Sequence, residues 1–377
     1  MSISPINFFN LLTNDGIDFF SGVPDSLLKE FCLCLDDNVA PQNHVISANE
    51  GNAIALAAGY HLGTGKLPLV YMQNSGLGNA VNPLISLCDP EVYSIPMLVV
   101  IGWRGEPGVA DEPQHKKQGQ IQENLLAALD LPYITFSATE NNIESKINKA
   151  VTSAMADKRP FVILVKKGTF SKYGTSLSQK ETGLIKRENA LEIILESLPD
   201  NAIIVSTTGK TSREIFEIRA IRNEPHYKDF LTVGSMGHCS SIALGIALSK
   251  PDRKVFCIDG DGALIMHMGS LATAGKLQAK NLYHLLINNK VHESVGGQKT
   301  AANGINLPAL VRSNGYNSVQ SCSKKTDLKK KVEQFVLATG PAFLELIVEP
   351  GSRNDLGRPT IKPVDNKQEF MKYISGE

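Results

Sequence analysis

The stretch KVFCIDGDGALIMHMGSLATAGKLQAKNLYHLLINN, residues 254–289, decides the fold of this chain. It contains two short apolar runs, 254–259 and 282–287, with a helical pattern between them. An apolar strand, a helix and a second apolar strand are typical of one right-handed crossover between parallel strands. Such a crossover brings the loops after both strands to the same edge of the sheet. We therefore expect Asp261, after the first strand, and Asn289, after the second, to converge there.

The same alternation of apolar runs and helical stretches extends over the rest of the chain. It predicts an α/β protein with two doubly wound parallel-sheet domains. The predicted strands of the first half lie near residues 17–21, 44–48, 68–73, 95–101, 132–136 and 160–166. Those of the second half lie near residues 202–206, 229–233, 254–259, 282–287, 317–322 and 342–348. The clearest helical patterns of the first half cover residues 25–35, 50–62 and 141–155.

A polar segment rich in Gly, Ser, Thr and Lys interrupts this periodicity at 168–187. We predict a first domain over 1–170, a linker over 171–187 and a second domain over 188–377. No middle domain fits between them. The two halves share a plan but show no repeat of sequence.

Composition restricts the class of partner. The 38 basic and 38 acidic residues cancel, so neither nucleic acid nor an anionic membrane is an expected partner. No apolar run reaches membrane-spanning length and residues 1–28 contain no Lys or Arg, so we expect a cytoplasmic protein. The six cysteines show no CxxC pair and no zinc-ligand spacing, which predicts free buried thiols.

The residues after the two central strands supply oxygen ligands. The carboxylate of Asp261, the amide of Asn289 and a main-chain carbonyl form part of an octahedral shell, which Mg²⁺ usually completes with phosphate and water. Gly260 and Gly262 allow close approach of the backbone to a diphosphate. A simple turn and an unrelated Asn pair would explain either piece alone, but their separation across a strand-helix-strand unit favours the metal site.

The sequence does not match either of two common nucleotide-binding motifs. The GKT triplet at 209–211 lacks the Gly that a phosphate-binding loop needs five residues before it, because Ile204 stands there. The dinucleotide fingerprint fails at Ile265 and at Val81, where its third Gly belongs. A plain dehydrogenase is therefore a weak alternative.

The GDG triplet at 260–262, followed by Asn288 and Asn289, resembles the motif of thiamine-diphosphate enzymes. The resemblance implies thiamine diphosphate with Mg²⁺ as cofactors. It implies Asp261, Asn289 and the main-chain oxygen of Val291 as metal ligands, and a structural role for Asn288.

Further segments resemble other parts of that cofactor site. Glu50, at the start of a predicted helix, resembles the carboxylate that activates the pyrimidine ring of the cofactor. A helix-start carboxylate that interacts with the macrodipole is the simpler alternative. Met236 resembles the side chain that wedges the cofactor into its bent shape, although a Met can also fill a gap in a core. The resemblance assigns the other cofactor contacts to Thr207, Thr208, Gly209, Gly234, Ser235, Gly260, Asp261, Gly262, Ala263 and Asn289.

Loops elsewhere make the resemblance more specific. The segments 21–28, 103–119 and 351–359 are similar to those of the phosphonopyruvate decarboxylases, a family close to the sulfopyruvate decarboxylases. The chain departs from the family pattern at Lys290, where Gly is more frequent, and at Lys299, where Pro is usual. The resemblance implies decarboxylation of a small acidic 2-oxo acid, phosphonopyruvate, in phosphonate biosynthesis. It also implies a homodimer or larger homo-oligomer with active sites between subunits.

Such a reaction needs acid and base groups beside the reacting carbon. The candidates are Asp25, His115 and Glu293. Asp25 follows Pro24 at a strand-to-helix turn and could instead be an N-cap. His115 lies in a predicted loop, where a solvated His is the simpler interpretation.

A phosphonate carries nearly two negative charges and requires basic partners. The candidate residues are Arg104, Arg353 and Arg358, each of which could equally be a surface charge. Two alternative functions stay open. One is a sulfopyruvate decarboxylase or a carboligase with the same cofactor, and the other is a non-catalytic cofactor-binding or assembly protein. The joint presence of Glu50, Asp261 and Asn289 argues against the second.

Overall fold

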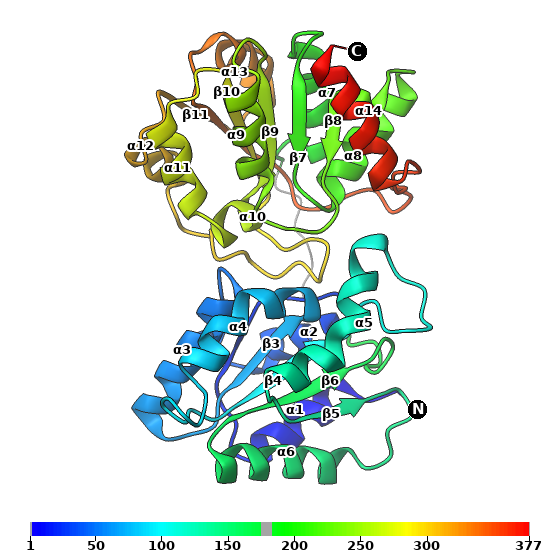
Figure 1. The fold of residues 1–377 in the computed structure, drawn as a ribbon, viewed down its shortest axis with the longest axis vertical. Helices are drawn as coiled ribbons and strands as arrows, with labels where there is room; N and C mark the ends of the chain where they lie inside the picture. Colours follow the sequence, from blue (N-terminus) through cyan, green and yellow to red (C-terminus); the bar gives the residue numbers. More distant parts are fainter. Residues whose placement is uncertain (1, 175–182, 377) are drawn as a thin grey trace. The chain divides into compact units, whose positions relative to one another are not determined.

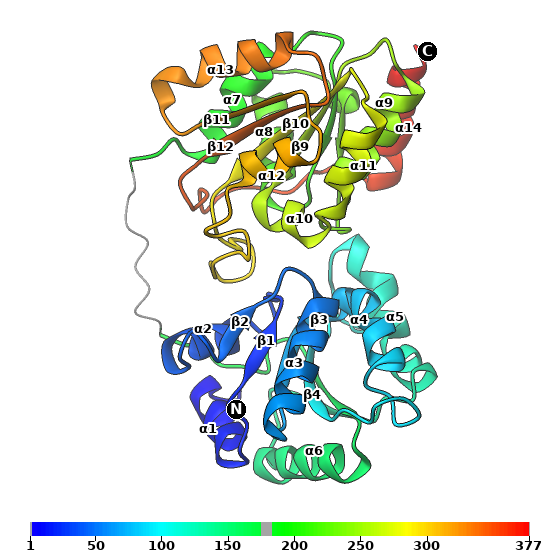
Figure 2. The same cartoon turned by 90° about the vertical axis from the view of Figure 1, so that its left-hand side faces the viewer.

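The computed structural model describes residues 2–174 and 183–376. Residues 175–182, inside the predicted linker, lie outside the described residues. The chain divides into two compact units, Met1–Ser178 with His292–Ala301 and Gln179–Val291 with Ala302–Glu377. Each unit contains a six-stranded parallel sheet with helices on both faces (Figures 1 and 2). The predicted fold class is confirmed.

The first unit has its strands in the order β2-β1-β3-β4-β6-β5. These strands are β1 (Phe20–Gly22), β2 (His44–Ile46), β3 (Leu69–Gln73), β4 (Met97–Gly102), β5 (Tyr133–Phe136) and β6 (Pro160–Val165). Its helices are α1 (Pro5–Asn14), α2 (Lys29–Asn38), α3 (Glu50–Thr64), η1 (Asn74–Gly76), α4 (Leu77–Ser86), α5 (Pro113–Ala128) and α6 (Ile143–Asp157). All six strands predicted for this half are present. The helix predicted from residue 25 begins only at Lys29.

The second unit has its strands in the order β11-β12-β10-β9-β7-β8. They are β7 (Ile203–Ser206), β8 (Asp229–Leu231), β9 (Val255–Gly260), β10 (Leu282–Asn288), β11 (Ser318–Cys322) and β12 (Ala342–Ile347). Its helices are α7 (Arg187–Ser197), α8 (Lys210–Ile221), η2 (His226–Lys228), α9 (Cys239–Ser249), α10 (Asp261–Met266), α11 (Gly269–Leu277), α12 (Leu307–Ser313), α13 (Lys325–Leu337) and α14 (Pro363–Ser375). All six strands predicted for this half are also present.

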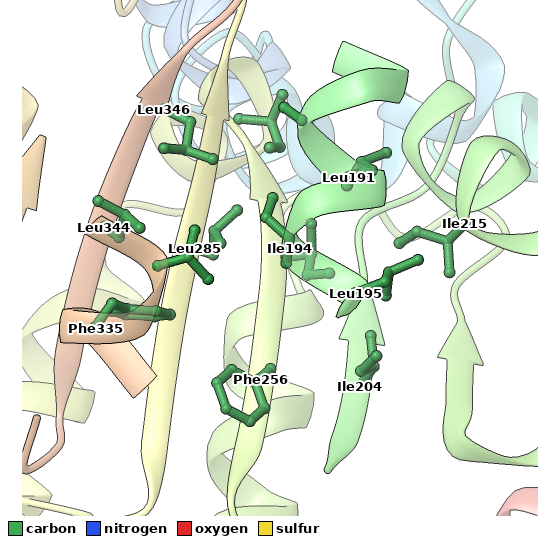
Figure 3. Packing of buried hydrophobic residues seen from close by; sticks show 14 of the residues in the cluster. Leu191, Ile194, Leu195, Ile204, Ile215, Phe256, Leu285, Phe335, Leu344 and Leu346 are labelled. Carbon is green, nitrogen blue, oxygen red and sulfur yellow. The ribbon is translucent and has the colours of Figure 1, made fainter. Parts of the chain in front are cut away.

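Strands that are covered on both faces explain the continuous apolar runs in the sequence. Successive side chains of a strand point to opposite faces, and in β3 Leu69 and Tyr71 join one buried cluster while Val70 and Met72 join another. In the second unit, Leu191 and its neighbours on α7 pack against side chains of β7, β9, β10 and β12 (Figure 3). Full burial of each such side chain contributes about 1.5–3 kcal/mol.

The charged residues Arg187 and Glu214 form a pair that is buried in the second unit. The Arg187 guanidinium donates two hydrogen bonds to Glu214, from Nε to Oε2 at 2.6 Å and from Nη2 to Oε1 at 2.7 Å. The side chains are 4% and 1% exposed. This bidentate pair joins α7 to α8.

Both sheets have the same topology. Counted within each unit, the strands lie in the order second, first, third, fourth, sixth and fifth. The direction of winding therefore reverses between β1 and β3, and again between β7 and β9. Ligands of doubly wound sheets bind outside the carboxyl ends of the strands at such a point. No described helix is long and apolar enough to span a membrane.

Candidate active site

Asp25 lies just beyond β1, at the reversal point of the first sheet, and is fully buried. Gln73 at the end of β3 donates from Nε2 to its Oδ1 at 2.6 Å, and the Leu27 amide donates to its Oδ2 at 3.0 Å. Burial raises the pKa of Asp25, although the Gln73 hydrogen bond opposes part of that rise. Asp25 is no helix N-cap, because α2 begins at Lys29 after an N-cap at Leu28. The structure therefore contradicts the alternative prediction that Asp25 is a helix N-cap.

Arg104 and His115 lie at the same edge of the first sheet. The Arg104 guanidinium donates from Nε to Asp111 Oδ2 at 2.8 Å and from Nη1 to Ser26 Oγ at 2.8 Å. Burial, and then the nearby Arg104 charge, lower the pKa of His115 to about 4. His115 Nδ1 is buried and has no hydrogen-bond partner in the described part of the chain. The imidazole is consequently neutral near pH 7, and it lies in the first turn of α5 rather than in the predicted loop.

Glu50 is the first residue of α3, but the residue is only 5% exposed and its side chain packs against the start of α4. Asn79 donates from Nδ2 to Glu50 Oε2 at 2.7 Å. A Cβ atom added to Gly76 would lie 2.1 Å from Oε1, so only glycine leaves room for this carboxylate. Burial raises the pKa of Glu50. The N-cap of α3 is Asn49, so Glu50 is a buried, oriented carboxylate as well as a helix-start residue.

The reversal point of the second sheet is formed by the turn after β7. Thr207 is buried, and Thr208 Oγ1 accepts a hydrogen bond from the amide of Gly234 at 3.0 Å. This bond connects the turn after β7 to the Gly234–Gly237 turn after β8. Gly209 has φ +97° and gives α8 no side-chain cap. An uncapped helix N-terminus suits an anion such as a diphosphate.

The Gly234–Gly237 turn packs against the helix that follows β9. Gly234 and Ser235 both have positive φ, at +69° and +47°, and Met236 is half-buried. A Cβ on Gly237 would lie 2.9 Å from the carbonyl oxygen of Ala263 on α10. The Gly234–Gly237 turn and the helix α10, both of which contain candidate cofactor contacts, therefore lie directly beside each other.

Strands β9 and β10 place the metal-ligand candidates at one edge. Gly260 ends β9 and pairs with Ile287 of β10, so Asp261 and the Asn pair follow the two strands at the same level. Asp261, Asn288 and Asn289 are all buried. Asp261 begins α10, which also contains Gly262 and Ala263. The predicted crossover is confirmed.

The two asparagines have different surroundings. Asn288 donates from Nδ2 to Glu345 Oε1 at 2.8 Å and accepts from the Lys290 amide at 3.2 Å, which makes it part of the sheet structure. Asn289 Oδ1 accepts from the Val291 amide at 3.2 Å. Lys290 itself has φ +64°, a conformation in which glycine is less strained.

Two family models cover most of the chain. Residues 7–128 match the N-terminal TPP binding domain of thiamine pyrophosphate enzymes, and residues 207–346 match the C-terminal TPP binding domain. A phosphonopyruvate decarboxylase of Streptomyces viridochromogenes is 35% identical over 97% of this chain and 93% of its own. The chain belongs to the thiamine-diphosphate-dependent decarboxylases. A second phosphonopyruvate decarboxylase, of Streptomyces hygroscopicus, is 34% identical over 97% of this chain and 92% of its own. A sulfopyruvate decarboxylase of Methanosarcina acetivorans is 26% identical over 97% and 96%.

Membership in this decarboxylase family makes the chain a carbon-carbon lyase that uses thiamine diphosphate, with Mg²⁺ as the usual partner metal. The donors at the second sheet fit these groups. They comprise a buried carboxylate, a buried amide oxygen, two threonine hydroxyls and an uncapped helix N-terminus. Oxygen donors of this kind are the ligands that Mg²⁺ prefers.

The three remaining candidate residues of this decarboxylase are Arg353, Arg358 and Glu293. The guanidinium of Arg353 pairs with Glu188 at 2.9 Å, with Asp355 at 3.2 Å and with Glu217, so three carboxylates already surround it. Arg358 is exposed. Glu293 is half-buried in the segment His292–Ala301, which groups with the first unit.

The sequence did not reveal the residues that orient the carboxylates. Gln73 fixes Asp25, Asn79 fixes Glu50 and Gly76 makes room for Glu50. A weak signal was available, because Gln73, Asn74 and Gly76 follow a predicted strand at the edge where ligands bind. Their partners are distant in sequence, and no local pattern identifies them.

Proposed function

We propose that this decarboxylase converts phosphonopyruvate to phosphonoacetaldehyde and CO₂, with thiamine diphosphate and Mg²⁺. The observation that carries the proposal is the 35% and 34% identity to two phosphonopyruvate decarboxylases over 97% of the chain, against 26% over the same share for the Methanosarcina acetivorans sulfopyruvate decarboxylase. Separate sulfopyruvate decarboxylase subunits reach 36% and 37% identity, but over only 51% and 32% of the chain. The aldehyde product would serve phosphonate biosynthesis in the cytoplasm.

The second unit would hold the diphosphate and the metal. Asp261, the side chain of Asn289 and the carbonyl of Val291 are the proposed Mg²⁺ ligands. Support comes from their shared sheet edge and from the separate, structural hydrogen bonds of Asn288. The proposed remaining cofactor contacts are Thr207, Thr208, Gly209, Gly234, Ser235, Met236, Gly260, Gly262 and Ala263. Bound thiamine diphosphate supplies a nucleophilic carbon and an electron sink for the loss of CO₂.

The first unit would supply the proton-transfer groups. Glu50 would exchange a proton with the pyrimidine ring of the cofactor, since burial makes its carboxyl more readily protonated and Asn79 holds Oε2 in place. Asp25 is the proposed acid beside the reacting carbon, because its burial raises its pKa and Gln73 fixes its orientation. His115 would act as a neutral imidazole. Glu293 is a further candidate proton-transfer group, and it is proposed from the family resemblance alone.

Arg104 is the proposed contact for the phosphonate. It lies at the same sheet edge as Asp25 and His115, and its charge influences the pKa of each. Asp111 and Ser26 hold its guanidinium in one orientation. Arg353 is a weaker choice, because its three carboxylate partners compete with a bound anion.

CO₂ release from a panel of 2-oxo acids tests the substrate. We expect turnover of phosphonopyruvate, its loss on removal of thiamine diphosphate or Mg²⁺, and phosphonoacetaldehyde as product. Pyruvate should give far slower release. Turnover of sulfopyruvate alone would replace the proposed substrate with the sulfonate. No turnover of any 2-oxo acid at saturating cofactor would support a non-catalytic role.

We further propose a homodimer as the smallest active assembly, with active sites between subunits as the family resemblance implies. Mixing an inactive Glu50→Gln chain with an inactive Asp261→Ala chain tests this. Recovered activity supports shared sites. Its absence after demonstrated subunit exchange argues for sites within one chain.

A further inference from the structure

Two buried carboxylates lie in the second sheet just before the metal-ligand candidates. Asp259 is in β9 and Glu345 is in β12, and the two residues are 0% and 6% exposed. Both pair in register with Leu286 of the intervening strand β10, so the three residues form one row across the sheet. This row comes two residues before Asp261 on β9 and two residues before Asn288 on β10. We call Asp259 and Glu345 the row carboxylates.

The row carboxylates lie on one face of the sheet. Successive side chains of a strand point to opposite faces. Ile258 and Leu344, which directly precede them, belong to the apolar cluster on the other face. No Lys or Arg pairs with either carboxylate in the described part of the chain. A buried carboxylate costs free energy unless its partners compensate it, so the groups that bind the row carboxylates indicate what these residues do.

Asp259 uses both of its carboxylate oxygens. Its Oδ1 accepts a hydrogen bond from the Gly260 amide at 2.8 Å, and its Oδ2 accepts one from His284 Nε2 at 3.3 Å. His284 is 1% exposed on β10, and its Nδ1 lies 3.4 Å from the Tyr316 hydroxyl. The neighbouring strand therefore fixes the carboxylate, and the carboxylate holds the amide of the residue directly before Asp261.

Glu345 has the corresponding arrangement at the other strand end. Its Oε1 accepts from Asn288 Nδ2 at 2.8 Å, and its Oε2 accepts from the Ser321 hydroxyl of β11 at 2.8 Å. Asn288 directly precedes Asn289, and its own Oδ1 accepts from the Lys290 amide at 3.2 Å. The bonds that begin at Glu345 thus reach the residues on both sides of Asn289.

We propose that Asp259 and Glu345 are positioning residues of the metal site, an inference that rests on the proposed function. Each holds the residue directly before one proposed Mg²⁺ ligand, Asp261 or Asn289. Mg²⁺ demands near-ideal octahedral geometry, so displaced ligands bind it less tightly. Groups that orient metal ligands typically contribute about 10–100-fold to metal affinity or activity. Neither carboxylate contacts the ion in this proposal.

Metal affinity of the full-length protein is the direct test. Mn²⁺ replaces Mg²⁺ as the probe, and the electron paramagnetic resonance signal of free Mn²⁺ is titrated at saturating thiamine diphosphate without substrate. The variants Asp259→Asn and Glu345→Gln keep the shape of the side chain but exchange an acceptor oxygen for an amide donor. Each should raise the Kd for Mn²⁺ by at least about tenfold.

The matched control is Asp229→Asn. Asp229 is also a fully buried carboxylate of the second unit, and it accepts hydrogen bonds from Arg219 Nε at 3.0 Å and Nη2 at 3.1 Å. It begins β8 and so lies at the amino end of its strand, whereas the metal-ligand candidates follow carboxyl ends. Loss of this buried pair should lower thermal stability and leave the Mn²⁺ affinity unchanged.

A milder variant keeps the inference testable if the two main variants do not fold. Ser321→Ala removes one donor to Glu345 from an exposed residue, and it should weaken Mn²⁺ binding by about threefold. Folded Asp259→Asn and Glu345→Gln proteins with wild-type affinity would overturn the inference, as would an equal loss in Asp229→Asn. If the main variants are unfolded, unchanged affinity in Ser321→Ala has the same meaning. Wild-type protein that binds no Mn²⁺ would refute the proposed metal site together with this inference.

Discussion

Substitution of Gly76 by Ala tests whether the position of the Glu50 carboxylate controls catalysis. Gly76 has φ −78° and ψ −15°, which alanine adopts without strain. The new Cβ would lie 2.1 Å from Glu50 Oε1 and 2.5 Å from its Cδ. Real Cβ contacts are at least about 3.0 Å, so the carboxylate must move by about 1 Å. A displacement of that size at a catalytic group costs about 100-fold in rate, or about 2.7 kcal/mol.

The matched control is Gly78→Ala, two residues along the chain. Nothing lies within 4 Å of a Cβ at Gly78, which is exposed on α4. This change should leave activity unchanged and stabilise the helix by up to about 1 kcal/mol. The assay is kcat/KM for CO₂ release at saturating thiamine diphosphate and Mg²⁺, with thermal unfolding of both variants. A folded Gly76→Ala enzyme within twofold of wild type would refute the reasoning.

Three further predictions concern catalysis, pH dependence and stability. A Cβ at Gly102 would lie 2.0 Å from Asp25 Oδ2, so Gly102→Ala should lower kcat/KM about 100-fold; near-normal rates would show that the placement of Asp25 is unimportant. The pKa of His115 is about 4 in the folded protein, below its ordinary value, so the unfolded chain takes up the proton first and stability should fall as pH drops from about 6.5 toward 4. Urea unfolding across that range should show a smaller loss for His115→Gln than for wild type, and an equal loss would contradict the assignment. Glu214→Gln removes a carboxylate that pairs with the buried Arg187 guanidinium and should lower the free energy of unfolding by about 3–5 kcal/mol. A loss under about 1 kcal/mol in urea titration would mean that solvent reaches the pair.

The sequence was sufficient for the strands because parallel strands covered on both faces are continuously apolar. Helix starts were less predictable. The helical pattern predicted that α2 begins at residue 25, whereas it begins at Lys29. No side chain caps α2, so the sequence contains no cap signal that marks its start. His115 was assigned to a loop because the segment before it is rich in Gly and Pro, although Pro113 is well suited to begin a helix.

The site was predictable where residues follow strands and unpredictable where they meet across the fold. Asp261 and Asn289 share a sheet edge because one crossover separates them, and the sequence contains that crossover. The contact of Gln73 with Asp25 spans 48 positions, and that of Asn79 with Glu50 spans 29 positions. Contacts of this kind depend on the packing of whole elements, which no short pattern encodes.

Each of the two sheets is complete within its own unit. Every strand pairing and isolated bridge among the described residues joins partners within one unit. Cleavage in the segment between Tyr173 and Ile185 would therefore leave intact every strand pairing that the described residues form. The peptide link contributes proximity: it keeps the two sheets at a local concentration that separate polypeptides would reach only at about millimolar levels.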